Sequence, residues 1–383
     1  MKSVRFLQWA LAGVAALSLS MGGTVAATAA TPDQGVVAAK YASVGGAGGF
    51  LGQPVTPLRC GLPAGGCYRQ YRGGSVYWSS ASGAHVSLGG IRARWASFGW
   101  ERGFLGYPLT DENCTLVNRG CVQKFQGGLI YWQSSVGAHA VHGGILSKYA
   151  QMGYENSPLG YPRSDEACTG TTSKTCTQLY LGGSIVWRTG QGTSVTPTSG
   201  SIGYVVNKRR PNAPINRTPA DLVVVGSQYM RREAANQLQA MFRAAAGGGV
   251  GITTVSGFRS YSTQLALYNQ YVAQYGRAYA DTISARAGYS EHQTGLVMDI
   301  GNPNGACGLS ACFATTPAGA FAANHAWRYG FIVRYTNGYT AITGYAYEPW
   351  HLRYVGVRVS TAMHNLGYQT LEQYFGLPAA PDY

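Results

Sequence analysis

The sequence is short of acidic side chains and of charge in general. Its 383 residues include only 15 Asp and Glu against 29 Lys and Arg, and charged residues make up 11% of the chain. The formal net charge of +14 is spread evenly, because residues 31–200 and 201–383 each carry a net +6. A hydrophobic content of 45%, with 12% aromatic residues, excludes a disordered chain and provides enough apolar surface for two or three domains.

Long hydrophobic runs are missing after the N-terminus. Lys2 and Arg5 precede an apolar run over residues 6–19, and small residues follow over 24–30. This order predicts a secretory signal peptide over residues 1–30, and the run is short for a membrane span. An uncleaved anchor is the alternative, which the lack of a strong stop-transfer flank disfavours. We therefore expect a secreted protein with no transmembrane span in the mature chain.

The basic charge indicates the kind of partner. An exported basic protein is attracted to anionic polymers such as cell-wall polysaccharides, or to membrane surfaces. Nucleic acid fits the charge but not the compartment, so we expect no nucleic-acid partner.

The eight cysteines contain no Cys-x-x-Cys spacing, which argues against a thiolate zinc site. They fall into four close pairs, and an even count with local spacing in an exported chain predicts four disulfides. The expected pairs are Cys60 with Cys67, Cys114 with Cys121, Cys168 with Cys176, and Cys307 with Cys312.

A repeat with a period of 54 residues fills the first half of the chain. Leu-Gly dipeptides begin at Leu51, Leu105 and Leu159, each followed by a proline, and the cysteine pairs keep nearly the same register. Each copy continues into a strand such as "GGSVYW" or "GGLIYW". We expect a short helix, a Gly-Pro turn with the disulfide loop, and a hairpin of short strands in every copy. The third copy loses the pattern in "TGQGTSVTPTSGS" and is interpreted as terminal.

The stretches "FLGQP", "FLGYP" and "PLGYP" resemble LGFP repeats, which occur in exported bacterial proteins. The resemblance implies that residues 31–200 tie the protein to the cell envelope. Trp78, Trp132 and Trp187 leave two interpretations open: packing between strands, or a sugar-stacking surface between copies. His85 and His139 are expected to serve in turns or hydrogen bonds rather than at a metal.

From residue 201 the helices and strands become longer, which predicts an α+β domain over 201–383. A helix beginning at a capping Ser227 would place Met230, Leu238 and Met241 on one apolar face. The other expected elements are helices over 261–276 and 315–330 and strands over 251–257, 331–335 and 350–356.

Two short segments carry candidate chemistry. In "SEHQTGLVMDIG", a break at Thr294-Gly295 separates His292 from a strand that holds Asp299, so the two side chains can converge. In "YEPWHLRY", Pro349 interrupts a regular strand and can turn Glu348 and His351 toward one cavity.

A His-Asp-His set suits a catalytic zinc ion with its fourth position open for water. His292, Asp299 and His351 would be the ligands, and Glu348 would act as the general base. The alternatives are structural histidines and an ion pair between Glu348 and Arg353.

The second half closely resembles the VanY-type D-alanyl-D-alanine carboxypeptidases, zinc peptidases that trim bacterial cell-wall stem peptides. The resemblance covers about residues 204–375. It rests on "VVNKRRP" (205–211), "SGFRSYSTQ" (256–264), "SARAGYSEHQTGLVMDI" (284–300) and "ITGYAYEPWHLRYVG" (342–356).

The resemblance implies an α+β zinc peptidase fold with a small antiparallel sheet and helices, one zinc ion, and the ligands and base named above. Arg259 falls on the family's oxyanion-stabilising arginine, and Gln264 and Ser290 fall on positions that help to hold the peptide. Phe258 replaces the usual tyrosine and Val297 a common alanine. Neither change removes catalytic chemistry, but Phe258 costs a hydroxyl at the substrate pocket.

Several neighbouring side chains have other expected roles. Arg286 is expected to hold its loop to the fold, with contact to a substrate carboxylate as the alternative. His325 and His364 are expected to lie away from the metal. Tyr289 and Trp350 either shape the pocket or pack beneath it.

The expected function is an exported, wall-associated zinc carboxypeptidase that trims peptidoglycan stem peptides while its repeats bind cell-wall polysaccharide. The alternatives are an L,D-carboxypeptidase or a peptidoglycan endopeptidase with the same metal chemistry, and a catalytically silent wall-binding protein.

Overall fold

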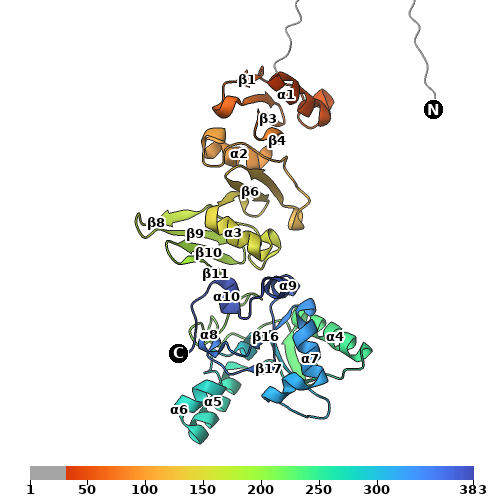
Figure 1. Ribbon diagram of the computed structural model, residues 1–383, viewed down its shortest axis with the longest axis vertical. Coiled ribbons are helices and arrows are strands. Elements are labelled where there is room, and N and C mark those ends of the chain that lie inside the picture. The colour runs from red at the N-terminus through yellow and green to blue at the C-terminus, as the bar shows by residue number, and fades with distance from the viewer. Residues whose placement is uncertain (1–31) are drawn as a thin grey trace, which may run out of the picture.

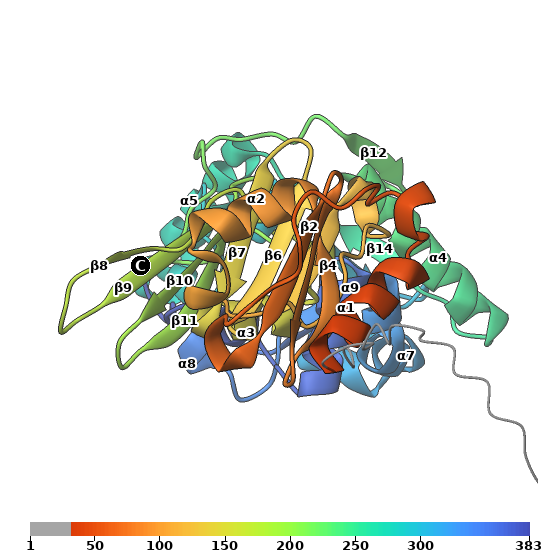
Figure 2. The ribbon, with the colours of Figure 1, turned by 90° about the horizontal axis from the view of Figure 1, so that it is seen from above.

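A computed structural model describes residues 32–383 as an elongated molecule, in which three small stacked units lead to a larger C-terminal part (Figures 1 and 2). The expected signal peptide lies outside the described residues. Within residues 32–383, no helix combines the length and apolarity that a membrane crossing requires.

The three copies of the repeat share one architecture. A helix precedes a loop with left-handed glycines, and an antiparallel sheet with a disulfide at its first strand follows. Copy one consists of α1 (Pro32–Ser43), β1 (Arg59–Cys60), β2 (Cys67–Tyr71), β3 (Gly74–Ser79) and β4 (Gly83–Ser87). Copy two consists of α2 (Gly89–Ser97), β5 (Cys121–Phe125), β6 (Gly128–Gln133) and β7 (Gly137–His142). Copy three consists of α3 (Gly143–Met152), β8 (Ala167–Thr169), β9 (Thr175–Tyr180), β10 (Gly183–Arg188) and β11 (Gly192–Pro197).

The third copy keeps the hairpin expected for every copy, although its sequence pattern ends early. Its last segment forms β11, which pairs with β10 along its whole length. Alternating threonine and valine side chains are suited to a half-buried strand, and Val195 is fully buried.

All four predicted disulfides are confirmed. The bonds join Cys60 with Cys67, Cys114 with Cys121, Cys168 with Cys176, and Cys307 with Cys312.

Adjacent copies are joined by a contact that repeats with the sequence. Asp111 of copy two pairs with Lys40 of copy one and accepts a 2.9 Å hydrogen bond from the Val86 amide. At the next junction, Asp165 pairs with Arg94 and accepts a 2.9 Å bond from the Ala140 amide. The period of 54 residues therefore has a structural cause, because each copy must present the same surface to the next.

The tryptophans of the strands pack against helices. A Cβ atom added at Gly90 would lie 2.6 Å from the indole of Trp132, and one added at Gly144 would lie 2.8 Å from the indole of Trp187. The two rings therefore cover the first turns of the helices that contain these glycines. This favours the packing interpretation for both. His85 bonds the Ser82 carbonyl through Nε2 at 2.9 Å, the turn role expected from the sequence.

The C-terminal part docks on copy three where a fourth copy would stack. Lys148, which follows Lys40 and Arg94 in the same register, is buried and hydrogen-bonds the carbonyl of Tyr374. Helix α3 packs against α9 (Val357–Leu366), and β11 packs against α10 (Leu371–Phe375). One buried core includes side chains from both sides of this joint, among them Tyr149, Met152, Val359, Met363, Leu371 and Tyr374.

The C-terminal part has an α+β fold around a four-stranded antiparallel sheet in the order β14-β15-β17-β16. These strands are β14 (Thr253–Ser256), β15 (Val297–Gly301), β17 (Glu348–Tyr354) and β16 (Phe331–Tyr335). The remaining helices and the hairpin are α4 (Arg232–Gly247), α5 (Tyr261–Tyr275), α6 (Arg277–Ile283), α7 (Pro317–His325), α8 (Thr340–Thr343), β12 (Leu222–Val225) and β13 (Gln228–Arg231). Helices α4 and α7 pack with the sheet in one buried core.

The predicted helix start at Ser227 is wrong. Residues 228–231 form strand β13, and α4 begins only at Arg232. The β-branched segment 222–225 pairs with 228–231 across a tight turn in which Gly226 has a φ of 59°. Strand pairing with this valine-rich segment therefore outweighs the helical period, although Met230 is still buried, as expected.

Candidate active site

His292 and Asp299 are brought together by a short turn before β15. Residues 291–294 form a 3-10 turn that ends at Gly295, whose φ of 68° allows the chain to reverse into the strand. His292 bonds the Gly257 carbonyl through Nδ1 at 2.8 Å, so this nitrogen carries the proton. Its other nitrogen, Nε2, lies 3.4 Å from Oδ2 of Asp299.

His351 lies directly opposite Asp299 in the pairing of β15 with β17. Its Nδ1 is 3.2 Å from Oδ1 of Asp299 and 3.4 Å from Oε2 of Glu348. Residues three apart on a regular strand point to opposite faces. Here the register with β16 shifts between Val333 and Tyr335, around Pro349, so Glu348 and His351 reach the same cavity. The sequence predicted this interruption.

The three side chains suit a divalent ion. Their donor atoms lie within 4.8 Å of one another, and all three residues are buried. Oδ1 of Asp299 accepts no hydrogen bond within residues 32–383. The 3.2 and 3.4 Å separations match the spacing of roughly 3.3 Å between ligands about 2.0 Å from a tetrahedral zinc ion. The residue types and their geometry therefore fit zinc.

Glu348 differs from the three ligand candidates in its exposure. Its side chain is 20% exposed, whereas those of His292, Asp299 and His351 are 8%, 7% and 5% exposed. Burial, reinforced by the charge of Asp299, raises the pKa of Glu348 to about 7 despite the opposing effects of His351 and Arg259. A carboxylate with this pKa at the edge of the cluster is suited to accept and return a proton.

Arg259 enters the same cavity from the loop before α5. Its two terminal nitrogens donate to Gln264 Oε1 at 2.8 Å and to Ser256 Oγ at 2.9 Å. The Gln264 amide also donates to the Ala285 carbonyl at 2.7 Å. Gln264 thus fixes Arg259, while Arg259, Gln264 and Ser290 all line a cavity of about 360 Å³ beside the candidate ligands.

Ser290 also has a structural role, because its hydroxyl accepts a hydrogen bond from the His292 amide at 3.3 Å. Peptide contact by Ser290 or Gln264 remains a prediction.

Three other predicted neighbours differ in where they lie relative to the ligands. Arg286 forms two hydrogen bonds to Asp281, at 2.8 and 3.0 Å, and its guanidinium covers the ring of Tyr383, which agrees with the loop-holding role. Tyr289 packs edge-on against Tyr383. Trp350 lines the cavity.

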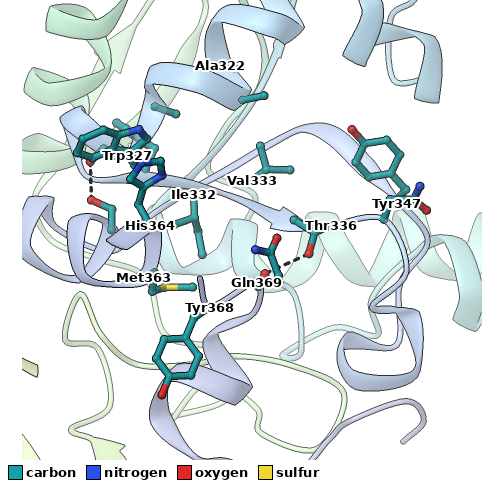
Figure 3. Close-up of a pocket in the computed structure, with 15 residues that line it drawn as sticks. Ala322, Trp327, Ile332, Val333, Thr336, Tyr347, Met363, His364, Tyr368 and Gln369 are labelled. Carbon is teal, nitrogen blue, oxygen red and sulfur yellow. Dashed lines mark hydrogen bonds between the residues drawn. The ribbon is translucent and has the colours of Figure 1, made fainter. Parts of the chain in front are cut away.

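A second cavity, of about 410 Å³, lies among α7, β16 and α9 (Figure 3). His364 stacks there on Trp327, with ring centres 4.1 Å apart, away from the candidate ligands. His325 packs against Phe321 on α7. Both histidines therefore occupy the peripheral positions that the sequence indicated.

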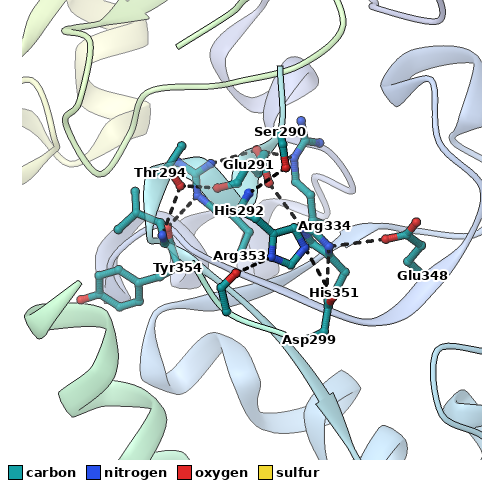
Figure 4. A network of polar contacts seen from close by, with 12 residues as sticks. Ser290, Glu291, His292, Thr294, Asp299, Arg334, Glu348, His351, Arg353 and Tyr354 are labelled. Atoms are coloured by element: carbon teal, nitrogen blue, oxygen red, sulfur yellow. Dashed lines mark hydrogen bonds and ion pairs between the residues drawn. The ribbon is translucent and has the colours of Figure 1, made fainter. Parts of the chain in front are cut away.

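The alternative pairing of Glu348 with Arg353 is wrong. Arg353 instead donates to Glu291 at 2.9 Å, and Arg334 donates to the same oxygen at 3.0 Å (Figure 4). This buried cluster was not predicted from the sequence. The sequence does contain a signal for it: the apolar strands "FIVRY" and "WHLRY" each include one arginine. An arginine buried in such a strand requires a buried acidic partner. Burial alone would raise the pKa of Glu291, but Arg334 and Arg353 hold it well below its usual range.

Segments in both halves of the chain match known protein families. Residues 227–357 match the family model of VanY, the D-alanyl-D-alanine carboxypeptidases, and residues 51–103 and 105–157 match LGFP repeats. A bifunctional D-Ala-D-Ala dipeptidase and carboxypeptidase of Enterococcus gallinarum is 34% identical over 176 residues, which are 44% of this chain and 91% of that protein.

Two solved structures are also similar. The LD-carboxypeptidase LdcB is 39% identical, with a TM-score of 0.44 over 46% of this chain and 86% of that one. A VanY D,D-pentapeptidase variant in complex with Zn(II) is 30% identical, with a TM-score of 0.40 over 45% of this chain and 97% of that one.

Proposed function

Because the chain belongs to the VanY family of D-alanyl-D-alanine carboxypeptidases, we propose that it is a zinc-dependent carboxypeptidase that removes the terminal D-alanine from peptidoglycan stem peptides. The observation that supports this most strongly is the convergence of His292, Asp299 and His351, with Glu348 beside them, in one cavity. Arg259 adds a fixed positive charge to the same wall.

A bound zinc ion would supply a Lewis acid that activates water and polarises the scissile carbonyl. Glu348 takes the proton of the attacking water as general base and returns it to the leaving amine, a role that its pKa of about 7 favours. The Arg259 guanidinium stabilises the negative charge that develops on the carbonyl oxygen. Its bonds to Gln264 and Ser256 hold it in place before substrate arrives.

We further propose the division of the chain into a signal peptide (1–30), an envelope-binding module of three LGFP repeats (31–200) and the peptidase domain (201–383). Export would place the protein at its polymeric substrate. The net +6 of the repeat module supports attraction to anionic wall polysaccharide. Retention at the wall raises the effective concentration of stem peptides without tight binding in the active site.

Product masses test this function. The full mature chain is incubated with a synthetic pentapeptide ending in D-Ala-D-Ala, and with a tetrapeptide ending in one D-Ala, with and without a chelator. We expect the pentapeptide to lose one alanine when the chelator is absent and to stay intact when the chelator is present. Glu348→Gln should lower the rate by at least about 10²-fold because the proton acceptor is removed.

Other products would identify the alternatives. Trimming of the tetrapeptide alone indicates an L,D-carboxypeptidase, and an internal cut indicates an endopeptidase. An unchanged rate in Glu348→Gln contradicts the proposed mechanism, and no product from either peptide favours a silent wall-binding protein.

A further inference from the structure

Glu291 precedes His292 in the sequence, but its side chain is directed to a different candidate ligand. The carboxylate is fully buried, and Oε1 accepts hydrogen bonds from Arg334 Nε at 3.0 Å and Arg353 Nη1 at 2.9 Å. The other oxygen, Oε2, lies 3.8 Å from Nε2 of His351. Glu291 and Glu348 thus approach His351 from different sides (Figure 4).

The two facing atoms, Oε2 of Glu291 and Nε2 of His351, have no competing hydrogen-bond partner among the described residues. Both atoms are buried. Unpaired buried polar atoms are costly, so an Nε2–H directed at the carboxylate is the arrangement that serves both. A proton on Nε2 leaves the Nδ1 lone pair facing Asp299 and the ligand cluster.

The partners of Glu291 are themselves held in place. Arg334 donates two further hydrogen bonds to Glu372, at 2.9 and 2.7 Å. Arg353 donates to the carbonyls of Ile202 and Tyr204, at 2.9 and 2.8 Å. The two arginines and the two glutamates of this cluster balance in charge.

We propose that Glu291 is a positioning residue for the metal site: its carboxylate faces Nε2 of His351, favours the proton on that nitrogen and so presents Nδ1 of the ring to the ion. This inference rests on the proposed function, because it requires a metal at the three ligands. The ring of Tyr335 packs beside that of His351, with ring centres 4.8 Å apart and the planes tilted by 50°. Carboxylates that orient a ligating histidine in this way typically contribute 10- to 100-fold in metal affinity.

Two isosteric variants of the full chain separate positioning from general stability. Glu291→Gln removes the acceptor charge at His351, whereas Glu372→Gln removes a partner of Arg334 without touching the ligands. The readouts are the zinc dissociation constant by chelator competition, the visible spectrum of the cobalt-loaded protein, and the melting temperature. We expect Glu291→Gln to weaken zinc binding about 10- to 100-fold and to change the cobalt spectrum. Glu372→Gln should lower the melting temperature but keep the wild-type zinc affinity and spectrum.

Wild-type zinc affinity in Glu291→Gln, or an equal loss in both variants, would overturn the inference. If Glu291→Gln does not fold, ring ¹⁵N spectra of the zinc-loaded wild type decide, since His351 must show a protonated Nε2 and a metal-bound Nδ1. The opposite assignment would overturn the proposal. Failure of the proposed function gives a different result, because wild-type protein would then bind no zinc at these ligands.

Discussion

At the scale of single residues, the candidate site is formed by four side chains from two short segments of the chain. His292, Asp299, His351 and Glu348 stand in short motifs whose residue types match zinc chemistry, and the structure gathers them within hydrogen-bond range. Glu291 is a sequence neighbour of His292, yet its side chain serves His351 through a long-range contact. Such a contact depends on strand pairing, which a local motif does not specify.

Arg259 offers a residue-scale test. Arg259→Lys keeps the positive charge but loses the planar pair of donors that bind Gln264 and Ser256, so the charge moves away from the developing oxyanion. We expect kcat/KM on the pentapeptide to fall about 10²- to 10³-fold with zinc affinity unchanged.

Arg286→Lys is the matched control, because Arg286 holds Asp281 and not the cavity. It should retain nearly full activity. Equal activity losses in the two variants would show that Arg259 has no special role.

At the scale of elements, the copies of the repeat provide internal comparisons. Helices and hairpins were predictable because glycines, prolines and alternating apolar residues recur every 54 positions. Strand β13 was not, since the helical pattern of 227–249 includes four residues that pair with the valine-rich β12 instead. Pairing between segments outweighs a local period where both segments can form strands.

Glu112 and Glu166 occupy equivalent positions in adjacent copies but have different surroundings. Glu166 lies 3.4 Å from His142 Nε2, whereas Oε2 of Glu112 has no hydrogen-bond partner within residues 32–383. Burial raises the pKa of Glu112 from its ordinary 4.5 to about 7. The folded state therefore binds this proton more tightly than the unfolded state, so stability falls as the pH rises from about 4.5 through 7.

We expect Glu112→Gln to raise the melting temperature of the full chain at pH 8, by about 2 °C, and to leave it unchanged at pH 4. The neutral amide avoids the cost of a buried charge at the higher pH only. Glu166→Gln should give no gain at either pH. Thermal scans of the three proteins check this, and a gain of equal size at pH 4 would exclude titration of Glu112 as the cause.

At the scale of the whole molecule, the repeat module and the C-terminal part form one packed body. The sequence indicated a change of character near residue 201, and in the structure copy three shares a core with helices α9 and α10 across this boundary. Lys148 takes the place in this joint that Lys40 and Arg94 take between copies. The period of the repeats could be predicted from the sequence. The contact of Lys148 with the C-terminal part could not, because its acceptor is the backbone carbonyl of Tyr374, and any residue type provides such a carbonyl.

Gly376 tests the joint. It ends α10 at a φ of 65°, and an added Cβ would lie 2.3 Å from the Thr193 carbonyl oxygen of β11. Gly367 ends α9 at a φ of 73° with no atom within 4 Å of an added Cβ. Gly367→Ala should therefore cost only the backbone strain of about 1–2 kcal/mol.

Gly376→Ala should cost roughly 1–3 kcal/mol more, because the clash forces copy three away from α10. Denaturant unfolding measures both variants, and solution scattering should show a looser shape for Gly376→Ala alone. Equal destabilisation would mean that the two halves do not pack as the structure shows.

We expect one zinc ion to bind His292, Asp299 and His351 beside Glu348. Anomalous diffraction at the zinc edge, from zinc-loaded crystals of the mature protein, locates the ion. A single peak should lie about 2.0–2.2 Å from Nε2 of His292, a carboxylate oxygen of Asp299 and Nδ1 of His351. A peak bound elsewhere, or no peak in zinc-loaded crystals, would contradict this expectation.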